Sequence, residues 1–489
     1  MEKISRIAEL WEAHNYKDIL TERLPIFDMV SPGGHSLCDI VLSFVHKCPK
    51  ELQEQHTISM LRFACLLYLA EKHKQANDLM QSIRAGIEKL QNKNERQTLL
   101  GEWTFVTSLF RYPNIDEMLQ TLRQADELVD GRVTVLEAND PFLIFLTDPA
   151  AVFHTEVGQA DVQGELFAEF VALYEKLTNG GGCGAAELYR AGIHYYRGDF
   201  NGAQLLCYKA VYLAESTGQA SLQIGAAGCL GRISIHNMDM EVFSEAVDML
   251  KQAAGSYPEY GNATKQMMEY ERNELYLEIP ITEYIPDWIK KGVVGSFPGM
   301  TYSFIKYAQL RYFFYTEKYE QCIGLGEALL RRPENYGVLL HALIGMFVAC
   351  SYLQLGDHKY GLEQFKEYLP LLFKDRLYLV FAYFYETMDG ILDDYLREEY
   401  PDDIDAIFAL MEEIRQGRRF FMQTYLTSGN DLSEKERAVA ELAAAGLQNK
   451  EISKRLGISP NTVRAHLRKI FEKLEISRRG EISERLNVI

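Results

Sequence analysis

The chain has 489 residues, of which 47% are hydrophobic and 25% are charged. This length exceeds the roughly 250–300 residues that one core usually organises, and the composition excludes a largely disordered protein, so we expect two or more folded domains. The formal net charge of −18 would by itself disfavour a nucleic-acid partner, but residues 431–489 carry a net charge of +3 and residues 1–430 one of −21.

The N-terminal segment MEKISRIAELWEAHNYKDIL contains interspersed acidic residues and no long apolar stretch. No run of about 18 uncharged apolar residues occurs anywhere in the chain, which argues against export and against a membrane partner. The eight cysteines are scattered without a CxxC pair. We therefore expect a cytoplasmic protein whose thiols are reduced and mostly buried.

Up to residue 430 the pattern is helical almost throughout, with apolar residues three and four positions apart. A weak pattern recurs: a small residue, a turn residue seven positions later, an aromatic residue or His two beyond, and a small residue three further on. The best copy is Ala191, Gly198, Phe200 and Ala203, and it resembles a tetratricopeptide repeat (TPR). Small residues let antiparallel helices approach each other. The sequence therefore predicts an all-α fold with a TPR-like α-solenoid.

Fainter copies of this pattern are Ala64, Glu71, His73 and Ala76; Ser234, Glu241, Phe243 and Ala246; Ala349, Gly356, His358 and Gly361; and Leu310, Glu317, Tyr319 and Cys322. Three stretches rich in Pro or Gly, residues 138–163, 179–184 and 279–301, break the helical pattern. Each could shape a binding site or pack against a neighbouring helix pair.

Tyrosines are numerous, and each offers an apolar body with a hydrogen-bonding tip. We expect most of them to pack between helices. A concave ligand surface is the alternative for five of them: Tyr195, Tyr196, Tyr302, Tyr307 and Tyr312.

A helical-repeat region over residues 1–425 is followed by a polar linker, residues 426–431, and by a small domain over residues 432–489. The domain is expected to contain four helices, at about 434–445, at about 450–456, from Pro460 onwards, and at about 480–488. Gly446 is suited to the helix stop after the first, and Asn449 can cap the second. Ser459 can cap the third, with Pro460 at its first position, where a missing N–H costs nothing.

On the third helix, Val463, Leu467, Ile470 and Leu474 fall on one side and predict a buried stripe. The opposite face carries Asn461, Ala465 and Arg468 and is flanked by Arg464. This face begins at the positive end of the helix dipole, so it suits a polyanion such as DNA.

Residues 432–486 resemble the C-terminal helix-turn-helix domain of LuxR-type (LuxR/GerE) transcription regulators. The resemblance rests on many fixed positions, namely Leu432, Glu436, Gly446, Asn449, Lys450, Glu451, Ile452, Leu456, Ile458, Ser459, Thr462, Val463, His466, Lys473, Leu474 and Arg478. It implies that Arg464, Ala465 and Arg468 contact bases of double-stranded DNA. Many family members carry Lys at the position of Arg464, so an Arg there could change the preferred base.

Four other residues are better suited to phosphate contacts: Lys450, Asn461, Thr462 and Lys469. The resemblance also implies that the last helix pairs two copies as a homodimer on a two-fold operator, through Ile482, Leu486 and Ile489. The alternative for these three residues is that they cap the core of their own domain. RNA polymerase is a further candidate partner of such a regulator.

The region before the tail lacks the alternating strands of a receiver domain over residues 1–130, and no GxxxxGK[ST] phosphate-binding loop occurs. Residues 60–420 resemble the helical-repeat sensor of MalT-like regulators without their ATPase. The segments GGGCGAAELYRAGIHYYRGDF and IPDWIKKG…FPGMTYSFIKYAQLRYFF carry most of this likeness. It implies that this region senses a small-molecule or protein effector. Because the acidic region disfavours DNA, we expect the effector to shift a balance between states that hide and expose the tail.

The sequence thus predicts a DNA-binding transcription regulator with no cofactor, no metal site and no catalytic residue. One alternative is a protein-interaction scaffold whose C-terminal domain no longer reads DNA. An enzyme is the weakest alternative, because the sequence has no GxSxG, HExxH or dinucleotide-binding motif.

Overall fold

The computed structural model describes residues 2–22, 37–137, 140, 142, 148–256, 261–293, 301–332, 337–388, 390–429, 432–474, 476, 478–480 and 482. All regular secondary structure within these ranges is helical, which confirms the predicted all-α class. Among the same residues no helix has the length and apolar character needed to span a membrane.

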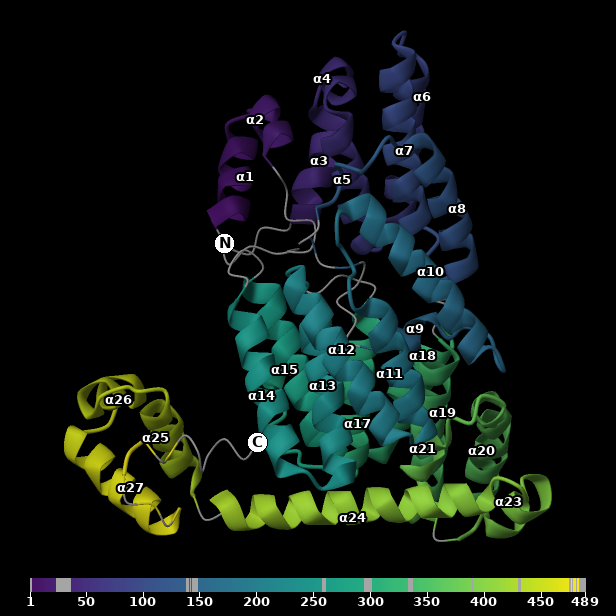
Figure 1. Cartoon of the computed structure of the whole chain (residues 1–489). Coiled ribbons are helices and arrows are strands. Elements are labelled where there is room, and N and C mark those ends of the chain that lie inside the picture. The colour runs from purple at the N-terminus through teal and green to yellow at the C-terminus, as the bar shows by residue number, and fades with distance from the viewer. Residues whose placement is uncertain are drawn as a thin grey trace.

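The first helices of the chain form one end of the molecule, at the top of Figure 1. They are α1 (Glu2–Glu12), α2 (Tyr16–Thr21), α3 (Leu37–Lys47), α4 (Lys50–Gln55), α5 (Thr57–Leu69), α6 (His73–Glu88), α7 (Lys93–Leu109) and α8 (Ile115–Leu128). The helices of the middle region follow as α9 (Pro149–Phe153), α10 (Ala160–Thr178), α11 (Ala185–Arg197), α12 (Phe200–Ser216), α13 (Ala220–Asn237), α14 (Met240–Gly255), α15 (Gly261–Glu278) and α16 (Asp287–Lys290).

The next group comprises α17 (Tyr302–Tyr315), α18 (Tyr319–Leu330), α19 (Val338–Gln354), α20 (His358–Phe373), α21 (Tyr378–Ala382), α22 (Tyr385–Met388) and α23 (Asp393–Glu399). Successive helices pack against each other as in a solenoid, for example α11 on α12 and α19 on α20. The array also returns on itself, because α19 packs on α9 and α21 packs on α11. Helices far apart in the sequence therefore enclose a common interior.

The repeat pattern correctly locates four helix–turn–helix junctions. Its turn residues Glu71, Gly198, Glu317 and Gly356 all have positive φ and lie directly between paired helices. At the best copy, Asp199 then caps α12 by accepting a hydrogen bond from the Gly202 amide at 2.9 Å.

The copy beginning at Ser234 was placed wrongly along the chain. Glu241 lies inside α14, and the actual turn is three residues earlier, at Met238, which has a φ of 56°. Asp239 then caps α14 by accepting from the amides of Glu241 and Val242, so the local cap decides where this helix begins.

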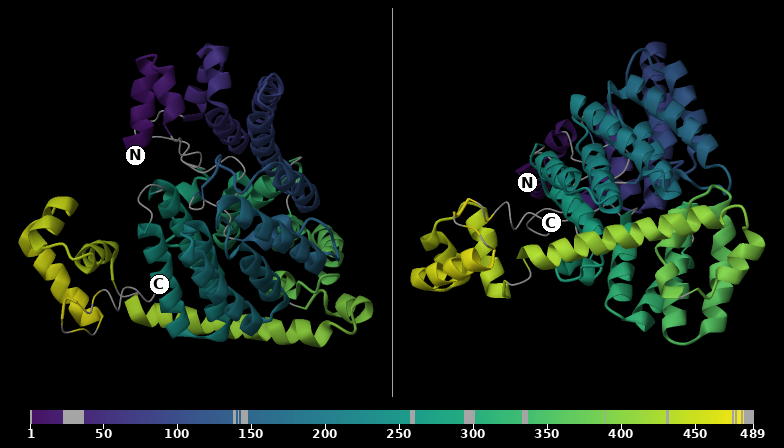
Figure 2. Two further views of the ribbon diagram at one scale, coloured as in Figure 1. Left: turned by 45° about the horizontal axis from the view of Figure 1, so that its top comes forward. Right: turned by 60° about the horizontal axis from the view of Figure 1, so that its bottom comes forward.

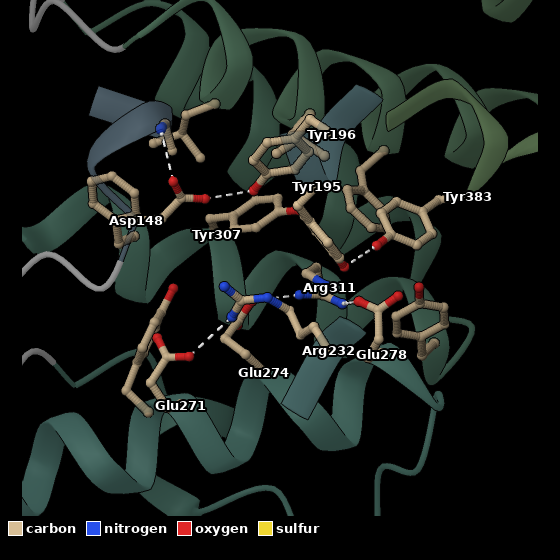
Figure 3. Close-up of a pocket in the computed structure, with 17 residues that line it drawn as sticks. Asp148, Tyr195, Tyr196, Arg232, Glu271, Glu274, Glu278, Tyr307, Arg311 and Tyr383 are labelled. Carbon is tan, nitrogen blue, oxygen red and sulfur yellow. Dashed lines mark hydrogen bonds and ion pairs between the residues drawn. The ribbon is translucent and has the colours of Figure 1, made fainter. Parts of the chain in front are cut away.

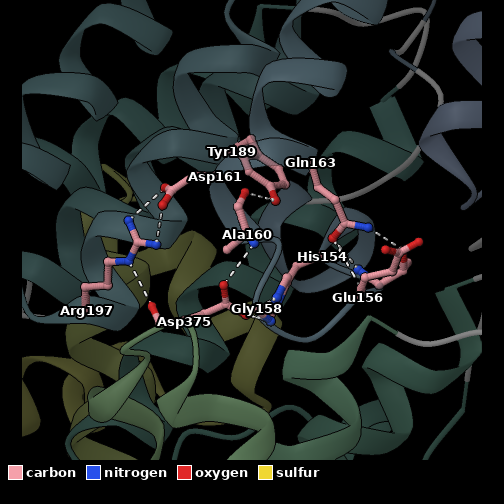
Figure 4. A network of polar contacts seen from close by, with 10 residues as sticks. His154, Glu156, Gly158, Ala160, Asp161, Gln163, Tyr189, Arg197 and Asp375 are labelled. Atoms are coloured by element: carbon pink, nitrogen blue, oxygen red, sulfur yellow. Dashed lines mark hydrogen bonds and ion pairs between the residues drawn. The ribbon is translucent and has the colours of Figure 1, made fainter.

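A buried polar cluster joins the segment before α10 to the turn after α20 (Figure 4). Asp375 accepts hydrogen bonds from the amides of Gly158 (2.6 Å) and Ala160 (3.0 Å), and its Oδ2 lies 2.9 Å from Nε2 of His154. Burial raises the pKa of Asp375, but His154 and the two amides outweigh burial and hold that pKa below its ordinary value. This carboxylate fixes how two distant parts of the array meet.

Helix α24 (Ile404–Gly429) runs along the base of the helical array and leads to α25 (Glu434–Ala444), α26 (Asn449–Leu456) and α27 (Pro460–Lys473) (Figures 1 and 2). It packs closely on α13, because a Cβ added at Gly417 would lie 2.3 Å from the carbonyl oxygen of Ile235. Because α24 ends at Gly429, it includes the first four residues of the segment expected to be a linker, residues 426–431.

The described residues form a large hydrophobic core, a separate C-terminal core and a smaller cluster between α15, α16 and α17. The larger core extends from Ile7 to Phe421, and the C-terminal helices enclose their own core, from Leu432 to Ile482. Of the eight cysteines, all but Cys183 are buried, and none forms a disulfide.

Candidate nucleic-acid interface

The first C-terminal helix, α25, begins with reciprocal capping. Ser433 Oγ accepts from the Glu436 amide at 3.3 Å, and Glu436 Oε2 accepts from the Ser433 amide at 2.9 Å. The same carboxylate oxygen lies 2.8 Å from Nζ of Lys473, at the end of α27. Glu436 thus connects the start of the domain to the end of the third predicted helix.

The start of α26 differs from the prediction. Its N-cap is Gln448 and not Asn449, and the Gln448 amide donates to Glu451 Oε2 at 2.6 Å. The Asn449 side chain instead accepts a hydrogen bond from Nη1 of Arg479 at 2.6 Å. The Asn449 side chain, which the local pattern predicts to cap α26, therefore makes a tertiary contact with the segment after α27.

Helix α27 begins as the sequence predicts. Ser459 Oγ accepts from the Thr462 amide at 3.1 Å, and Pro460 occupies the first turn. Val463 and Ile470 are fully buried and Leu467 is 7% exposed. Because these residues recur at helical spacing, they fix which face of α27 points away from the core.

The outward face of α27 carries the predicted base-contact residues. Arg464, Ala465 and Arg468 are all exposed. Arg468 Nε lies 3.2 Å from Oε1 of Glu472 one turn later, and the two side chains are 85% and 64% exposed. A surface pair of this kind contributes at most about 1 kcal/mol, so the guanidinium can exchange this partner for a base edge.

The predicted phosphate-contact residues are also exposed: Lys450 on α26, and Asn461, Thr462 and Lys469 on α27. The Thr462 hydroxyl lies 2.8 Å from Ser459 Oγ, so it also takes part in the helix cap. The exposed N-terminal turns of α27 and the cation on α26 thus offer donors to a single polyanion.

Of the three predicted dimerisation residues, the structure describes only Ile482. Ile482 is fully buried in the C-terminal core, which is the alternative that the sequence left open for it. Leu486 and Ile489 lie outside the described residues.

Sequence reasoning gave no role to three charged residues of this domain. Glu472 is the acidic neighbour of a predicted base-contact residue, and its i+4 spacing from Arg468 was a visible signal. The pairing of Lys473 with Glu436, 37 residues earlier, and that of Arg479 with Asn449, 30 residues earlier, had no such signal, because only packing brings these pairs together.

Glu436 makes the stability of this domain depend on pH. The Lys473 ammonium, followed by the Ser433 amide, lowers the pKa of Glu436 to about 2. A lowered pKa means that the stabilisation is present above about pH 4.3, the ordinary value for Glu, and is lost as the pH falls towards 2. We expect Glu436→Gln to cost about 1–2 kcal/mol at pH 7 and to flatten this acid dependence.

The measurement is thermal unfolding of residues 432–489, followed by far-ultraviolet circular dichroism between pH 2 and 7. The fragment has its own core, which makes it a suitable unit. Glu441→Gln, at an exposed position of the same helix, is the matched control. An unchanged acid transition in Glu436→Gln would contradict the assigned role.

The sequence of this domain matches a known protein family. Residues 430–485 match the model of the bacterial regulatory proteins of the luxR family. The transcriptional regulatory protein DesR of Bacillus subtilis (strain 168) is 30% identical over 130 residues, which is 25% of this chain and 64% of DesR. The transcriptional regulatory protein UhpA of Escherichia coli (strain K12) is 43% identical over 63 residues, which is 12% of this chain and 32% of UhpA.

The putative HTH-type transcriptional regulator YhjB of Escherichia coli (strain K12) is 40% identical over 57 residues, which is 12% of this chain and 28% of YhjB. The chain therefore spans less than two thirds of the length of each of these relatives. The C-terminal residues form a luxR-family helix-turn-helix domain, and these relatives are transcription regulators by name.

Proposed function

We propose that this protein is a cytoplasmic transcription regulator that binds double-stranded DNA through α27, and that the helical region before α24 senses an effector or a protein partner. The observation that carries the proposal is the exposed face of α27 in a luxR-family helix-turn-helix domain, with Arg464, Ala465 and Arg468 pointing away from the core. A helix of this kind fits the DNA major groove, where each base pair presents a distinct set of donors and acceptors.

Under this proposal the exposed residues have two roles. Arg464 and Arg468 each present a planar fork that can bond O6 and N7 of guanine, and Ala465 is small enough to contact a thymine methyl group. Lys450 and Lys469, together with Asn461 and Thr462, bind phosphates and fix the position of the domain on the duplex. We further propose that the protein binds as a homodimer on a two-fold operator and contacts RNA polymerase there.

The distribution of charge supports a regulatory role for the helical region. Residues 1–430 carry a net charge of −21, so they repel the polyanion that the tail attracts. The tail contacts this region, since the Arg437 guanidinium of α25 lies 4.6 Å from the ring centre of Tyr284. We propose that a MalT-like sensor without an ATPase uses such contacts to hold the tail in one of two positions, and that the effector changes the balance between them.

Salt-dependent binding to duplex DNA tests the proposal. The full chain is titrated into a duplex selected from a random-sequence pool, at several salt concentrations. We expect the logarithm of the association constant to fall linearly with the logarithm of salt concentration, as bound cations are released from phosphates. Lys450→Gln should reduce that slope by about one.

Lys74→Gln is the matched control, because Lys74 is an exposed lysine on α6, in the acidic region. Its slope should equal that of the unmodified protein. Absence of measurable binding at low salt, both by the full chain and by the isolated residues 432–489, would refute DNA binding and leave the scaffold interpretation of the sequence.

A further inference from the structure

A cavity lies inside the helical region, enclosed by α11, α13, α15, α17 and α19 (Figure 3). The cavity leaves about 60 Å³ for the centres of water-sized molecules, so it admits only a small ligand. The first Pro-rich break in the sequence contributes Asp148 and Ala151 to its wall. Of the five candidate tyrosines, Tyr195, Tyr196 and Tyr307 line the cavity, whereas Tyr302 and Tyr312 do not.

The two sides of the cavity differ in chemistry. One side is apolar and is formed by Phe304, Leu340, Leu343 and Phe347. The other side is acidic, because α15 presents glutamates at positions 271, 274 and 278, spaced three and four residues apart on one helical face. A ligand that fits this cavity therefore combines an apolar group with a polar group that carboxylates attract.

Two buried arginines neutralise part of the acidic side. Arg232 Nη1 lies 2.9 Å from Oε2 of Glu271, and Arg311 Nη1 lies 2.6 Å from Oε2 of Glu274. Arg311 also approaches Glu278, with 3.6 Å between Nη2 and Oε2. The arginines face carboxylates, so neither is positioned primarily for an anionic ligand.

Carboxylates outnumber guanidiniums among the lining residues, with four of the former and two of the latter. The fourth carboxylate, Asp148, accepts hydrogen bonds from the Tyr196 hydroxyl (2.6 Å) and the Ala151 amide (3.1 Å), which carry no charge. Arg418 Nη2 and His236 Nε2 both approach Glu278 Oε1, at 3.8 Å and 3.4 Å. Asp148, in contrast, has no Lys, Arg or His within ion-pair distance in the described part of the chain, so its side of the cavity is matched to a cation.

Oε1 of Glu274 lacks a hydrogen-bond donor within the described part of the chain, and its residue is only 7% exposed. A buried acceptor without a donor is unfavourable, and an N–H group from a ligand would relieve that cost.

We propose that this cavity binds a small organic cation, an ammonium attached to an apolar or aromatic group. The ammonium donates to Glu274 Oε1 and faces the excess charge of Asp148, while the apolar group packs on Phe304, Leu343 and Phe347. The role of this cavity as the effector site rests on the proposed function. The binding of the cation does not, because it is inferred from the geometry of the cavity alone.

The cavity is connected to the helix that carries the tail. Arg418 of α24 donates from Nε to the carbonyl oxygen of Glu278 at 2.9 Å, one helical turn after Glu274. The chain then reaches Tyr284, whose ring faces Arg437 of α25. Arg311 pairs with both Glu274 and Glu278, so a cation that binds Glu274 in place of Arg311 leaves Arg311 free to pair more closely with Glu278. Glu278 is also the residue that Arg418 of α24 contacts, so the contact between α15 and α24 changes as well.

Thermal unfolding of the full chain tests the site, with 2-phenylethylamine as the cationic probe. The neutral 2-phenylethanol and the anionic phenylacetate have the same ring, so they isolate the effect of charge. We expect the amine to raise Tm with increasing concentration, and the other two compounds to leave Tm unchanged. Cyclohexylmethylamine and 1,4-diaminobutane extend the cationic set to an aliphatic ring and to a chain without a ring.

Glu274→Gln should weaken amine binding at least tenfold, since it removes the charge and replaces the carboxylate by an amide. Glu320→Gln, at an exposed position on α18, is the matched control and should bind like the unmodified protein. If Glu274→Gln does not fold, Leu343→Trp provides the second variant. It fills the apolar side, leaves every charge in place and should also abolish the Tm increase.

The proposal is overturned if none of the three amines raises Tm up to about 10 mM, at which ligands with dissociation constants in the low millimolar range still stabilise measurably. It is also overturned if the alcohol or the acid raises Tm as much as the amine, or if both variants keep the response. Since no DNA is present, a failure of DNA binding leaves this result unchanged, and a failure here leaves the salt titration unchanged.

Discussion

Arg468→Ala is expected to weaken binding to the selected duplex by about 5- to 150-fold, which corresponds to about 1–3 kcal/mol. It is also expected to remove the preference for one base pair. The reason is that a guanidinium bonded to two acceptors of one base loses both bonds together, and alanine offers no donor in their place. Arg464→Ala should act in the same way at a neighbouring base pair, because both side chains are exposed on the same face of α27.

The measurement is fluorescence anisotropy at one fixed salt concentration, with the selected duplex and a set of single base-pair variants. Arg415→Ala on α24 is the matched control, since it removes an arginine whose side chain is 50% exposed and lies outside the tail. A loss that is equal for all duplexes would assign Arg468 to a phosphate. Unchanged affinity and unchanged preference would show that α27 does not read sequence.

Asp375→Ala is expected to lower the free energy of unfolding of the helical region by about 3–5 kcal/mol, because it removes one partner of a buried, hydrogen-bonded pair. The Asp375 and His154 side chains are 4% and 0% exposed. Without the carboxylate, the Gly158 and Ala160 amides and the His154 ring lose their shared acceptor (Figure 4). The contact between the segment before α10 and the turn after α20 should then weaken.

Urea unfolding followed by tryptophan fluorescence measures this effect selectively, because Trp11, Trp103 and Trp288 all lie in the helical region. Asp161→Ala is the matched control within the same cluster. Its carboxylate is 77% exposed and pairs with Arg197 at the surface, so the expected cost is below about 1 kcal/mol. Equal losses in the two variants would contradict the role assigned to Asp375.

The pH dependence of Asp375 has a definite sign. Its pKa is lowered in the folded chain, so its stabilisation is present above about pH 3.9, the ordinary value for Asp, and is lost as the pH falls through the lower folded value. In Asp375→Ala this part of the acid sensitivity should disappear, which the same urea titration at pH 3 and pH 7 would detect.

Most of the tail could be predicted from the sequence, because its determinants are local. Ser459, Pro460 and the stripe of Val463, Leu467 and Ile470 lie within one helix, and they suffice to define the face that carries Arg464 and Arg468. The predicted cap of α26 was wrong, because a residue distant in the sequence binds the side chain that was expected to cap the helix. Asn449 accepts from Arg479 and does not cap α26, and no pattern near Asn449 indicates that contact.

The helical region shows the same distinction. Four turns were located by a repeat whose small, turn and aromatic positions lie within 13 residues, whereas the copy at Ser234 was misplaced because Asp239 caps the next helix earlier. The extension of α24 to Gly429 was also missed. The polar composition of residues 426–431 suggested a linker, but composition alone does not end a helix that is already propagating.

The exposed face of α27 was thus determined by the sequence alone, since caps and helical periodicity act over a few residues. The cavity was decided by the tertiary structure, because its wall brings together Asp148, Arg232, Glu274 and Tyr383, which lie far apart in the sequence. The sequence shows the glutamates of α15 at helical spacing, but not the arginines that partly neutralise them or the apolar side that faces them. Those pairings arise when the array returns on itself, and burial then makes each unmatched charge significant.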